Sequence, residues 1–142
     1  MAPAMSAEVK RIFEQAPFIA DLGIELESLG QGECTTVLVI QPRHLQQDGY
    51  VHAGVQATVA DHTAGAAAAT LIREGQMVLT AEFRISLLRA ARGDRLRCIA
   101  RVLKPGRQLT VAEAEVFCIA ADGERLVSKA SVTLAVVDGR SG

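Results

Sequence analysis

The spacing of the apolar residues changes along the chain, and the first spacing is helical. Four apolar residues near the N-terminus recur at helical intervals: Val9, Ile12, Phe13 and Ala16. They predict a short amphipathic helix over about residues 7–15, with Ser6 as its N-cap and Pro17 just after its end. We expect this helix to pack as a lid over the rest of the chain.

After Gly23 the apolar and polar residues alternate. The segments GIELESL and ECTTVLVIQ flank a glycine turn at residues 30–32, and their alternation predicts two antiparallel strands. Pro42 is expected to end the second strand, because proline cannot donate a hydrogen bond to a sheet.

A long run of small apolar residues follows a polar connection. The stretch GYVHAGVQATVADHTAGAAAA, residues 49–69, is rich in alanine, and its composition and length predict a single helix from about Gly54 to Glu74. Because this helix is apolar almost all round, we expect it to be buried.

Alternating segments fill the remainder of the chain. They are MVLTAEFRISLLR, DRLRCIARVLK, QLTVAEAEVFCIA and RLVSKASVTLAVV, separated by the turns ARGD, PGR and ADGE. One long helix is available to cover the apolar face of these strands, so the sheet is expected to wrap around it. The predicted fold class is therefore α+β, with an antiparallel sheet around one long central helix in a single domain, residues 1–142.

Composition narrows the range of partners and compartments. The 142 residues are 49% hydrophobic and 22% charged, with 15 Lys and Arg against 16 Asp and Glu, which is typical of a packed domain. The basic residues are scattered, which argues against nucleic acid or a membrane surface as the partner. The N-terminus lacks the apolar core of a signal peptide and no window approaches the roughly 18 apolar residues of a spanning helix, so we expect a cytoplasmic protein.

Cysteine and histidine spacing does not suggest a metal site. Cys34, Cys98 and Cys118 have no C-x-x-C spacing, and each lies in a predicted strand. We expect them to be reduced residues of the core. The three histidines also lack ligand spacing, so no metal is expected.

The pair Asp61–His62 lies in the middle of the long predicted helix. A buried carboxylate needs partners or a chemical use, because burying it alone is costly. One interpretation is structural, with neighbouring hydroxyl groups or an arginine capping Asp61. The other is catalytic: the N–H groups of residues 53–56, at the helix start, would polarise a carbonyl oxygen that Asp61 helps to attack. Asp61 lies roughly 10 Å from that start, so a second copy with its helix antiparallel would have to complete the site.

These residues carry a resemblance to a known family. The string from Gln46 to Ala67, with QQDGYVHAG followed by ADHTAGAA, resembles the N-x-x-G-x-x-H-G-G and a-D-x-A signature of hotdog-fold acyl-CoA thioesterases of the PaaI (phenylacetate-pathway) type. The segment VLTAEFRISLLRAARGD and the turn at residues 104–107 are also similar to that family, and the likeness extends over about residues 18–137. The resemblance implies a hotdog fold.

The resemblance also implies roles for individual residues. Asp61 would be the nucleophile or general base, the Ala53 backbone N–H would polarise the thioester carbonyl, and His52 would hold the loop and assist the leaving thiolate. Gln46 stands where the family has Asn and keeps an amide near the thioester. Ala53 replaces the first Gly of the motif, and its Cβ would restrict a backbone that needs either positive φ or a close approach to substrate, so we expect a reshaped oxyanion hole.

Further residues are expected to contact substrate. The predicted substrate-binding residues are Gly54, Val55, Thr80 and Arg89, and the family resemblance implies that Thr80 positions a water. Arginines near strand ends are candidates for the phosphates of coenzyme A: Arg84, Arg89, Arg92 and Arg107. An apolar lining of modest size is expected from Phe18, Leu22, Val55 and Val59. His62 is expected to be a structural or interface residue.

The predicted function is hydrolysis of a small or aromatic acyl-CoA by a homodimer or homotetramer. No cofactor is expected, since coenzyme A is part of the substrate. Two alternatives stay open: a non-catalytic acyl-CoA-binding protein, and a hotdog hydratase or dehydratase that would use a histidine and a carboxylate on a β-hydroxyacyl substrate. A binder would retain acyl-CoA intact, whereas a hydrolase would release free thiol.

Overall fold

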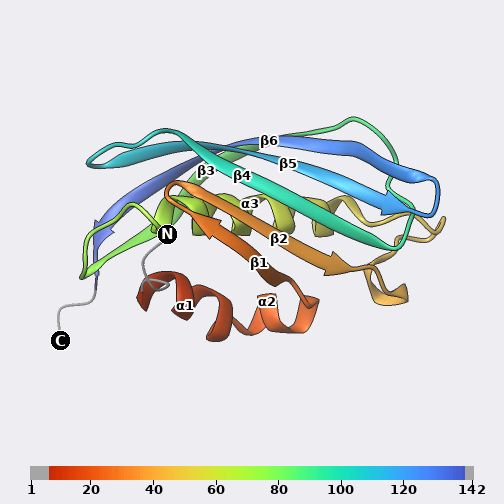
Figure 1. Ribbon diagram of the computed structural model, residues 1–142, viewed down its shortest axis with the longest axis horizontal. Coiled ribbons are helices and arrows are strands. Elements are labelled where there is room, and N and C mark those ends of the chain that lie inside the picture. Colours follow the sequence, from red (N-terminus) through yellow and green to blue (C-terminus); the bar gives the residue numbers. More distant parts are fainter. Residues whose placement is uncertain (1–6, 140–142) are drawn as a thin grey trace.

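A six-stranded antiparallel sheet curves around one long helix, as the sequence predicts (Figure 1). The computed structural model describes residues 7–139, and the expected cap at Ser6 lies outside them. The strand order is β1-β2-β4-β5-β6-β3. The elements in chain order are α1 (Ala7–Glu14), α2 (Pro17–Leu22), β1 (Glu25–Gly30), β2 (Glu33–Val39), a 3-10 turn (Pro42–His44), α3 (Ala53–Ala69), β3 (Gln76–Leu87), β4 (Arg95–Lys104), β5 (Leu109–Ala120) and β6 (Gly123–Asp138).

The core lies between α3 and the concave face of the sheet. Residues of β2, β4 and β5 alternate between buried and partly exposed positions, and α3 contacts β2, β3, β4, β5 and β6. Alanines line much of the buried surface of α3, and their small side chains let the strands approach on several sides. The expected reduced core cysteines are confirmed: Cys34, Cys98 and Cys118 are free and buried.

Two boundaries differ from the prediction. Residues Pro17–Leu22 form a second short helix that the sequence analysis missed, because Pro17 was interpreted as a stop whereas it occupies the first turn of α2. The long helix ends at Ala69 rather than at Glu74. Thr70 is the reason, since its hydroxyl donates to the Ala67 carbonyl and accepts from the Gly32 N–H at 2.7 Å in both bonds, which ties the helix end to the β1–β2 turn.

Strand β3 forms one edge of the sheet and pairs with β6 on one side only. Most of its residues are exposed, and they include the large apolar side chains of Leu79, Phe83 and Leu87. A long edge strand with exposed apolar residues is typical of a surface that another chain covers.

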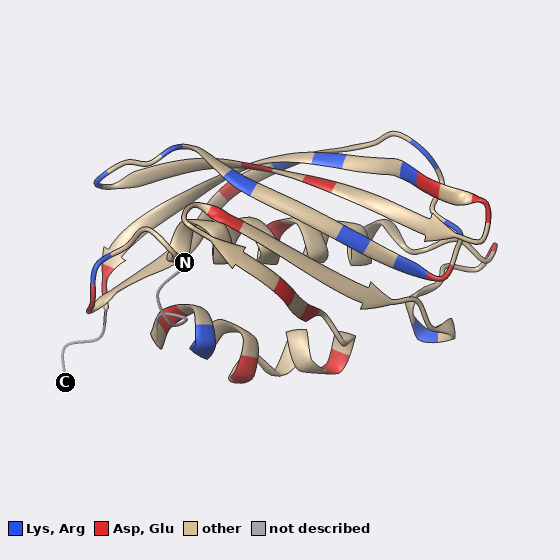
Figure 2. Ribbon diagram, in the orientation of Figure 1, with Lys and Arg blue, Asp and Glu red and all other residues tan. Residues whose placement is uncertain are grey.

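Charge is spread over the whole molecule. Acidic and basic residues are scattered over the strands, helices and loops in Figure 2. Of the residues described, none forms a helix long and apolar enough to cross a membrane. Within residues 7–139 no group of three or more His, Cys, Asp or Glu side chains is placed to hold a metal ion.

Candidate active site

The start of α3 is fixed by the histidine that precedes it. His52 is the N-cap residue, and its Nδ1 accepts a hydrogen bond of 2.8 Å from the Gly54 N–H. Since Nδ1 accepts, the neutral ring carries its proton on Nε2, where it is available as a donor. A Cβ on Gly54 would lie 3.1 Å from Nδ1, so a larger residue here would push the ring away by a few tenths of an ångström.

Ala53 presents a backbone N–H without an acceptor. Of the four N–H groups at residues 53–56 that were expected to be free, three have partners in the structure: the Gly54 N–H donates to the His52 ring, and those of Val55 and Gln56 donate to the His52 carbonyl. No acceptor within the described residues contacts the Ala53 N–H, which lies in the first turn of the helix. The expected oxyanion donor is thus a single amide.

The expectation that the backbone at Ala53 needs a positive φ was wrong. No residue other than glycine has a positive φ within residues 7–139, so Ala53 has ordinary helical geometry and its Cβ imposes no strain. The glycine that matters sterically is Gly54, through its contact with His52.

Gln46 holds the loop before the helix. Its Oε1 accepts from the N–H groups of Asp48, at 2.6 Å, and Tyr50, at 3.1 Å. Gly49 makes the turn with φ of +87°. The amide oxygen of Gln46 is therefore used within the loop, and its NH₂ group is the part left to meet a ligand.

These groups line a cavity of about 480 Å³ at the end of the molecule where α3 begins. Its lining includes Gln46, Tyr50, His52, Ala53 and Arg89. The Arg89 guanidinium is held by a 2.9 Å bond from Nη1 to the Leu126 carbonyl, which leaves its other N–H groups to face a ligand.

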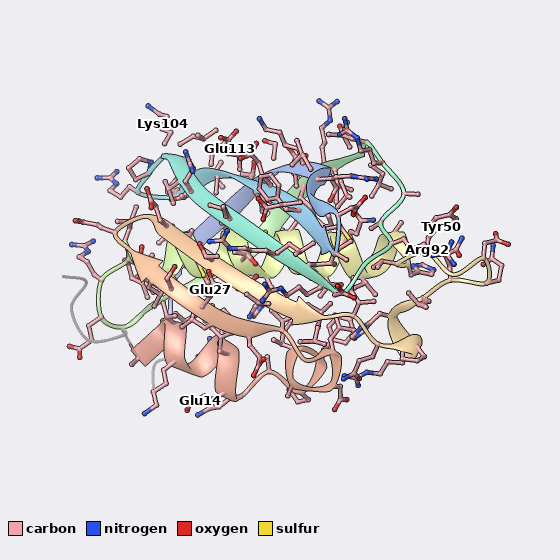
Figure 3. All side chains as sticks on the ribbon, turned by 45° about the vertical axis from the view of Figure 1, so that its right-hand side comes forward. Glu14, Glu27, Tyr50, Arg92, Lys104 and Glu113 are labelled. Carbon is pink, nitrogen blue, oxygen red and sulfur yellow. The ribbon has the colours of Figure 1, made fainter. Side chains whose placement is uncertain are left out.

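Tyr50 and Arg92 form a second polar feature beside this cavity. The Arg92 guanidinium carbon lies 5.6 Å from the centre of the Tyr50 ring, and Figure 3 shows the two side chains together at one end of the molecule. A cation over an aromatic ring at this distance is a favourable contact. Through Tyr50, which lines the cavity, the pair brings a positive charge close to it.

Asp61 lies on α3 and contacts β3. The Thr80 hydroxyl donates to Asp61 Oδ1 at 2.7 Å, which brings together two residues that the sequence analysis had named separately. The pairing of β3 with β6 shifts register between Thr80 and Glu82, and such a bulge redirects the neighbouring side chains. Burial raises the pKa of the Asp61 carboxyl above its ordinary value, and the Thr80 hydrogen bond offsets part of that rise.

A cavity of about 340 Å³ opens beside this carboxylate. Its walls differ from those expected: Val55 and Val59 are buried in the core, and neither they nor Phe18 and Leu22 line it. The apolar walls come from α1, β3 and β6 and from Ala16: Ile12, Ala16, Val78, Leu79 and Leu134. Arg11 and Gln15 of the α1 side complete it. The amphipathic spacing of α1 predicted that this helix packs over the rest of the chain. The sequence does not show which part of the sheet it covers, so the contribution of α1 to this cavity was not predicted.

His62 lines the cavity beside Asp61 and also packs against α1. Its ring makes an edge-to-face contact with Phe13, with centroids 4.7 Å apart and planes at 84°. Burial lowers the pKa of His62 to about 4, and its Nε2 is buried without a hydrogen-bond partner in the described part of the chain. The neutral ring anchors α1 to α3.

In one chain the two groups of residues stay apart. The cavity at the helix start and the cavity at Asp61 share no lining residue. A single chain therefore keeps the Ala53 N–H and the Asp61 carboxylate in two separate cavities.

Comparisons with known proteins add to this geometry. The family model described as the thioesterase superfamily matches residues 48–133, a segment that contains His52, Ala53, Asp61 and Thr80. The crystal structure of a thioesterase family protein from Silicibacter pomeroyi is 36% identical, with a TM-score of 0.90, and the match covers 93% of this chain and 97% of that one.

Two further relatives differ more in sequence. A 1,4-dihydroxy-2-naphthoyl-CoA hydrolase of Listeria monocytogenes is 27% identical over 115 residues, which are 81% of this chain and 91% of that protein. The crystal structure of a phenylacetic acid degradation-related protein from Ralstonia eutropha is 23% identical with a TM-score of 0.77, and the match covers 90% of this chain and 98% of that one. The second is a likeness of fold.

Proposed function

Since this chain belongs to the thioesterase superfamily, we propose that it hydrolyses a small or aromatic acyl-CoA to a free acid and coenzyme A, in a site completed by a second copy of the chain. The family membership establishes the hotdog fold and the activity of a thioester hydrolase. We place the chain in the PaaI type of this family on the motif in residues 46–67. Coenzyme A enters as part of the substrate, and the three free cysteines support a reducing compartment, the cytoplasm.

The Asp61–Thr80 pair carries the proposal. A half-buried carboxylate with a raised pKa is a stronger base than a solvated one, and it faces a cavity wide enough for a compact acyl group. About 340 Å³ is near the low end of the roughly 300–1,000 Å³ of ligand pockets, which supports a small or aromatic acyl group. Thr80 holds Oδ1, so Oδ2 remains to accept a proton.

The proposed reaction is a water attack assisted at both ends of the thioester. Asp61 removes a proton from a water molecule, whose oxygen bonds to the thioester carbon. The Ala53 N–H of the other half-site, which is the helix-start cavity of the second copy, donates to the carbonyl oxygen as it becomes negative. The carbon–sulfur bond then breaks, the leaving sulfur takes the proton that Asp61 removed from the water, and His52 Nε2–H donates a hydrogen bond to that sulfur as it leaves. The Thr80 contact favours this general-base role over direct attack by Asp61, since it orients the carboxylate and leaves space for water.

A second copy is needed because the half-sites are separate. Asp61 lies in one cavity and the Ala53 amide in the other, on a helix whose rise places them roughly 10 Å apart. Two copies related by a two-fold axis, with antiparallel α3 helices, would place each Asp61 near the partner's helix start. The open edge of β3 and its exposed apolar side chains support this surface as the contact.

A proline at residue 53 tests the amide directly. Ala53→Pro removes the N–H, and proline is favoured in the first turn of a helix. His52 has φ of −59° and ψ of 138°, which is the extended geometry that a residue before proline requires. We expect Ala53→Pro to fold and to lose about 10²–10³ in kcat. Ala53→Ser, which keeps the N–H, is the matched control and should lose far less.

The measurement is thiol release from acetyl-, hexanoyl-, dodecanoyl-, benzoyl- and phenylacetyl-CoA, with Asp61→Asn tested beside the residue 53 variants. Turnover that survives Asp61→Asn in a folded protein would remove Asp61 from the chemistry. If no substrate releases thiol while acyl-CoA stays bound and intact, the protein is a binder rather than a hydrolase.

A further inference from the structure

Arg11 lies between two hollows of the molecule. It lines the cavity of about 340 Å³ beside Asp61, and it also lines a larger hollow of about 610 Å³ at the N-terminal end of α1. The larger hollow is bounded mainly by the α3–β3 connection and the start of β3, among them Ile72, Arg73 and Met77. A group that extended from Asp61 past Arg11 would enter this hollow.

The Arg11 side chain is held in place by a neighbour on the same helix. Its Nε donates to Glu8 Oε1 at 3.0 Å, and its Nη2 donates to Glu8 Oε2 at 2.9 Å. The Glu8 side chain is 10% exposed and the Arg11 side chain 37%, so the pair is partly shielded from solvent. A bidentate arginine–carboxylate contact fixes the guanidinium more firmly than a single bond.

Packing fixes the helix that carries the pair. Val9 is completely buried, and Phe13 contacts the ring of His62 on α3. The α1 backbone is therefore anchored to the same helix that carries Asp61, and Arg11 has a defined position relative to the carboxylate.

The walls of the cavity beside Asp61 differ in polarity. The walls from Ile12, Val78 and Leu134 are apolar, whereas Arg11 brings a charged group and its partner Glu8. An alkyl chain that reached this side would have to displace the guanidinium or cover an ion pair, and covering an ion pair with apolar groups costs free energy that water no longer offsets.

We propose that Arg11, held by Glu8, closes the far side of the acyl cavity and limits the length of the acyl group that the enzyme accepts. The inference rests on the proposed function, because it takes the cavity beside Asp61 as the acyl site. Arg11 is a specificity-determining residue in this proposal, and the larger hollow is the space that it denies to long straight chains.

The test compares acyl chain length in wild type, Arg11→Ala and Arg11→Met. The substrates are straight-chain acyl-CoAs from acetyl to hexadecanoyl, and the readout is kcat/KM for each. We expect Arg11→Ala to raise the ratio of dodecanoyl to hexanoyl kcat/KM by about tenfold or more, the range that a few methylene groups produce in an apolar pocket. Arg11→Met, which keeps most of the length but no charge, should give a smaller rise.

Controls separate this proposal from a general effect on folding. Lys10→Ala, an exposed change on the same helix, should leave the length ratio at its wild-type value. Glu8→Gln keeps Arg11 but weakens its anchor, and it should raise the ratio partway even if Arg11→Ala fails to fold. A structural defect alone would lower kcat/KM for all chain lengths equally and leave the ratio unchanged, which would overturn the proposal.

Binding distinguishes failure of this inference from failure of the proposed function. S-alkyl-CoA thioethers, which cannot be hydrolysed, are titrated into wild type and Arg11→Ala by calorimetry. If the length profile of binding shifts in Arg11→Ala without turnover of any thioester, the length limit holds and the hydrolase assignment fails. Turnover with an unchanged profile overturns the length limit alone, and the absence of both binding and turnover overturns both.

Discussion

At the residue scale, Asp61 is subject to two opposing influences. Burial raises the pKa of its carboxyl, while the hydrogen bond from Thr80 stabilises the ionised form and offsets part of the rise. A base with a raised pKa accepts protons more readily, but it also needs a higher pH to be ionised. In the proposed mechanism, Thr80 therefore helps to set the pH range in which the enzyme is active.

Thr80→Val should move the acid limb of the pH profile upward. Removing the hydroxyl leaves burial unopposed, so the pKa of Asp61 rises further and the pH below which kcat/KM falls becomes higher. The measurement is kcat/KM across pH 4–9 for wild type, Thr80→Val and Thr80→Ser. Thr80→Ser keeps the donor and should follow the wild-type profile, and a Thr80→Val profile with the same acid limb would contradict this role.

His62 makes the fold sensitive to acid. Its pKa is lowered by burial to about 4 from the usual 6.5, so the unfolded chain binds a proton that the folded chain does not. The free energy of unfolding is therefore unaffected by the titration of His62 above pH 6.5, and it decreases as the pH falls from 6.5 toward 4. This pKa shift corresponds to a decrease of at most about 3 kcal/mol in the free energy of unfolding.

His62→Met should remove that acid sensitivity. Methionine fills a similar volume beside Phe13 without a group to protonate, and the unpartnered Nε2 disappears with the ring. Urea unfolding at pH 7.5 and pH 5 should show a smaller loss of free energy of unfolding for His62→Met than for wild type. His52→Gln, a change at an exposed histidine, is the control and should retain the wild-type loss.

At the element scale, the start of α3 depends on a glycine for its contact with His52. An added Cβ at Gly54 would lie 3.1 Å from His52 Nδ1, whereas one at Gly65 would lie 3.6 Å from Leu134 Cδ2, an ordinary contact. The two helical glycines are thus under different constraints.

Gly65→Ala should stabilise the fold, whereas Gly54→Ala should impair catalysis. Gly65→Ala gains up to about 1 kcal/mol of helix propensity, which should appear as a higher free energy of unfolding in urea. Gly54→Ala displaces the His52 ring and should reduce kcat/KM by about tenfold or more, because small displacements of positioning groups are costly to catalysis. Full activity in Gly54→Ala would show that the His52 contact has no part in the reaction.

Most of the fold was predictable because its elements have strong periodic signals. The alternation in β2, β4 and β5 and the alanine-rich run of α3 fixed six strands around one helix. The errors fall where local signals are ambiguous. Pro17 both ends one helix and starts the next, and the end of α3 depends on Thr70 meeting the distant Gly32 N–H.

Both residues of the Asp61–Thr80 contact were named from the sequence, whereas the walls of the cavity beside them were not. Asp61 was noticeable as a charge in an apolar helix, and its partner Thr80 came from the family resemblance. Arg11 and Ile12 were not predicted to line the Asp61 cavity, because their place depends on how α1 packs against α3 and β3. Contacts between distant elements of this kind cannot be predicted from the spacing of apolar residues within one segment.

At the scale of the whole molecule, the proposed site can be tested by mixing two inactive chains. Ala53→Pro lacks the amide of one half-site, and Asp61→Asn lacks the carboxylate of the other. If each site combines both chains, a mixed dimer contains one intact site of two. A random mixture, half of it mixed dimers, should then recover about a quarter of wild-type activity.

The measurement is thiol release after the two variants are refolded together, with each variant refolded alone as the control. Sites built within single chains would stay inactive in the mixture, because every chain would carry a defect in its own site. Recovery that depends on mixing would identify the assembled oligomer as the active species.

The buried cysteines have a consequence for an enzyme that handles thioesters. Cys34, Cys98 and Cys118 are at most 5% exposed, and burial raises the pKa of Cys34 and Cys98 to about 12 and that of Cys118 in the same direction. The thiolate is the reactive form of cysteine, so these sulfur atoms are both enclosed and protonated at neutral pH. A surface thiolate would accept acyl groups from coenzyme A by transthioesterification, and the protein would become acylated by its own substrate. This chain keeps its sulfur out of that exchange, so water remains the acceptor of the acyl group.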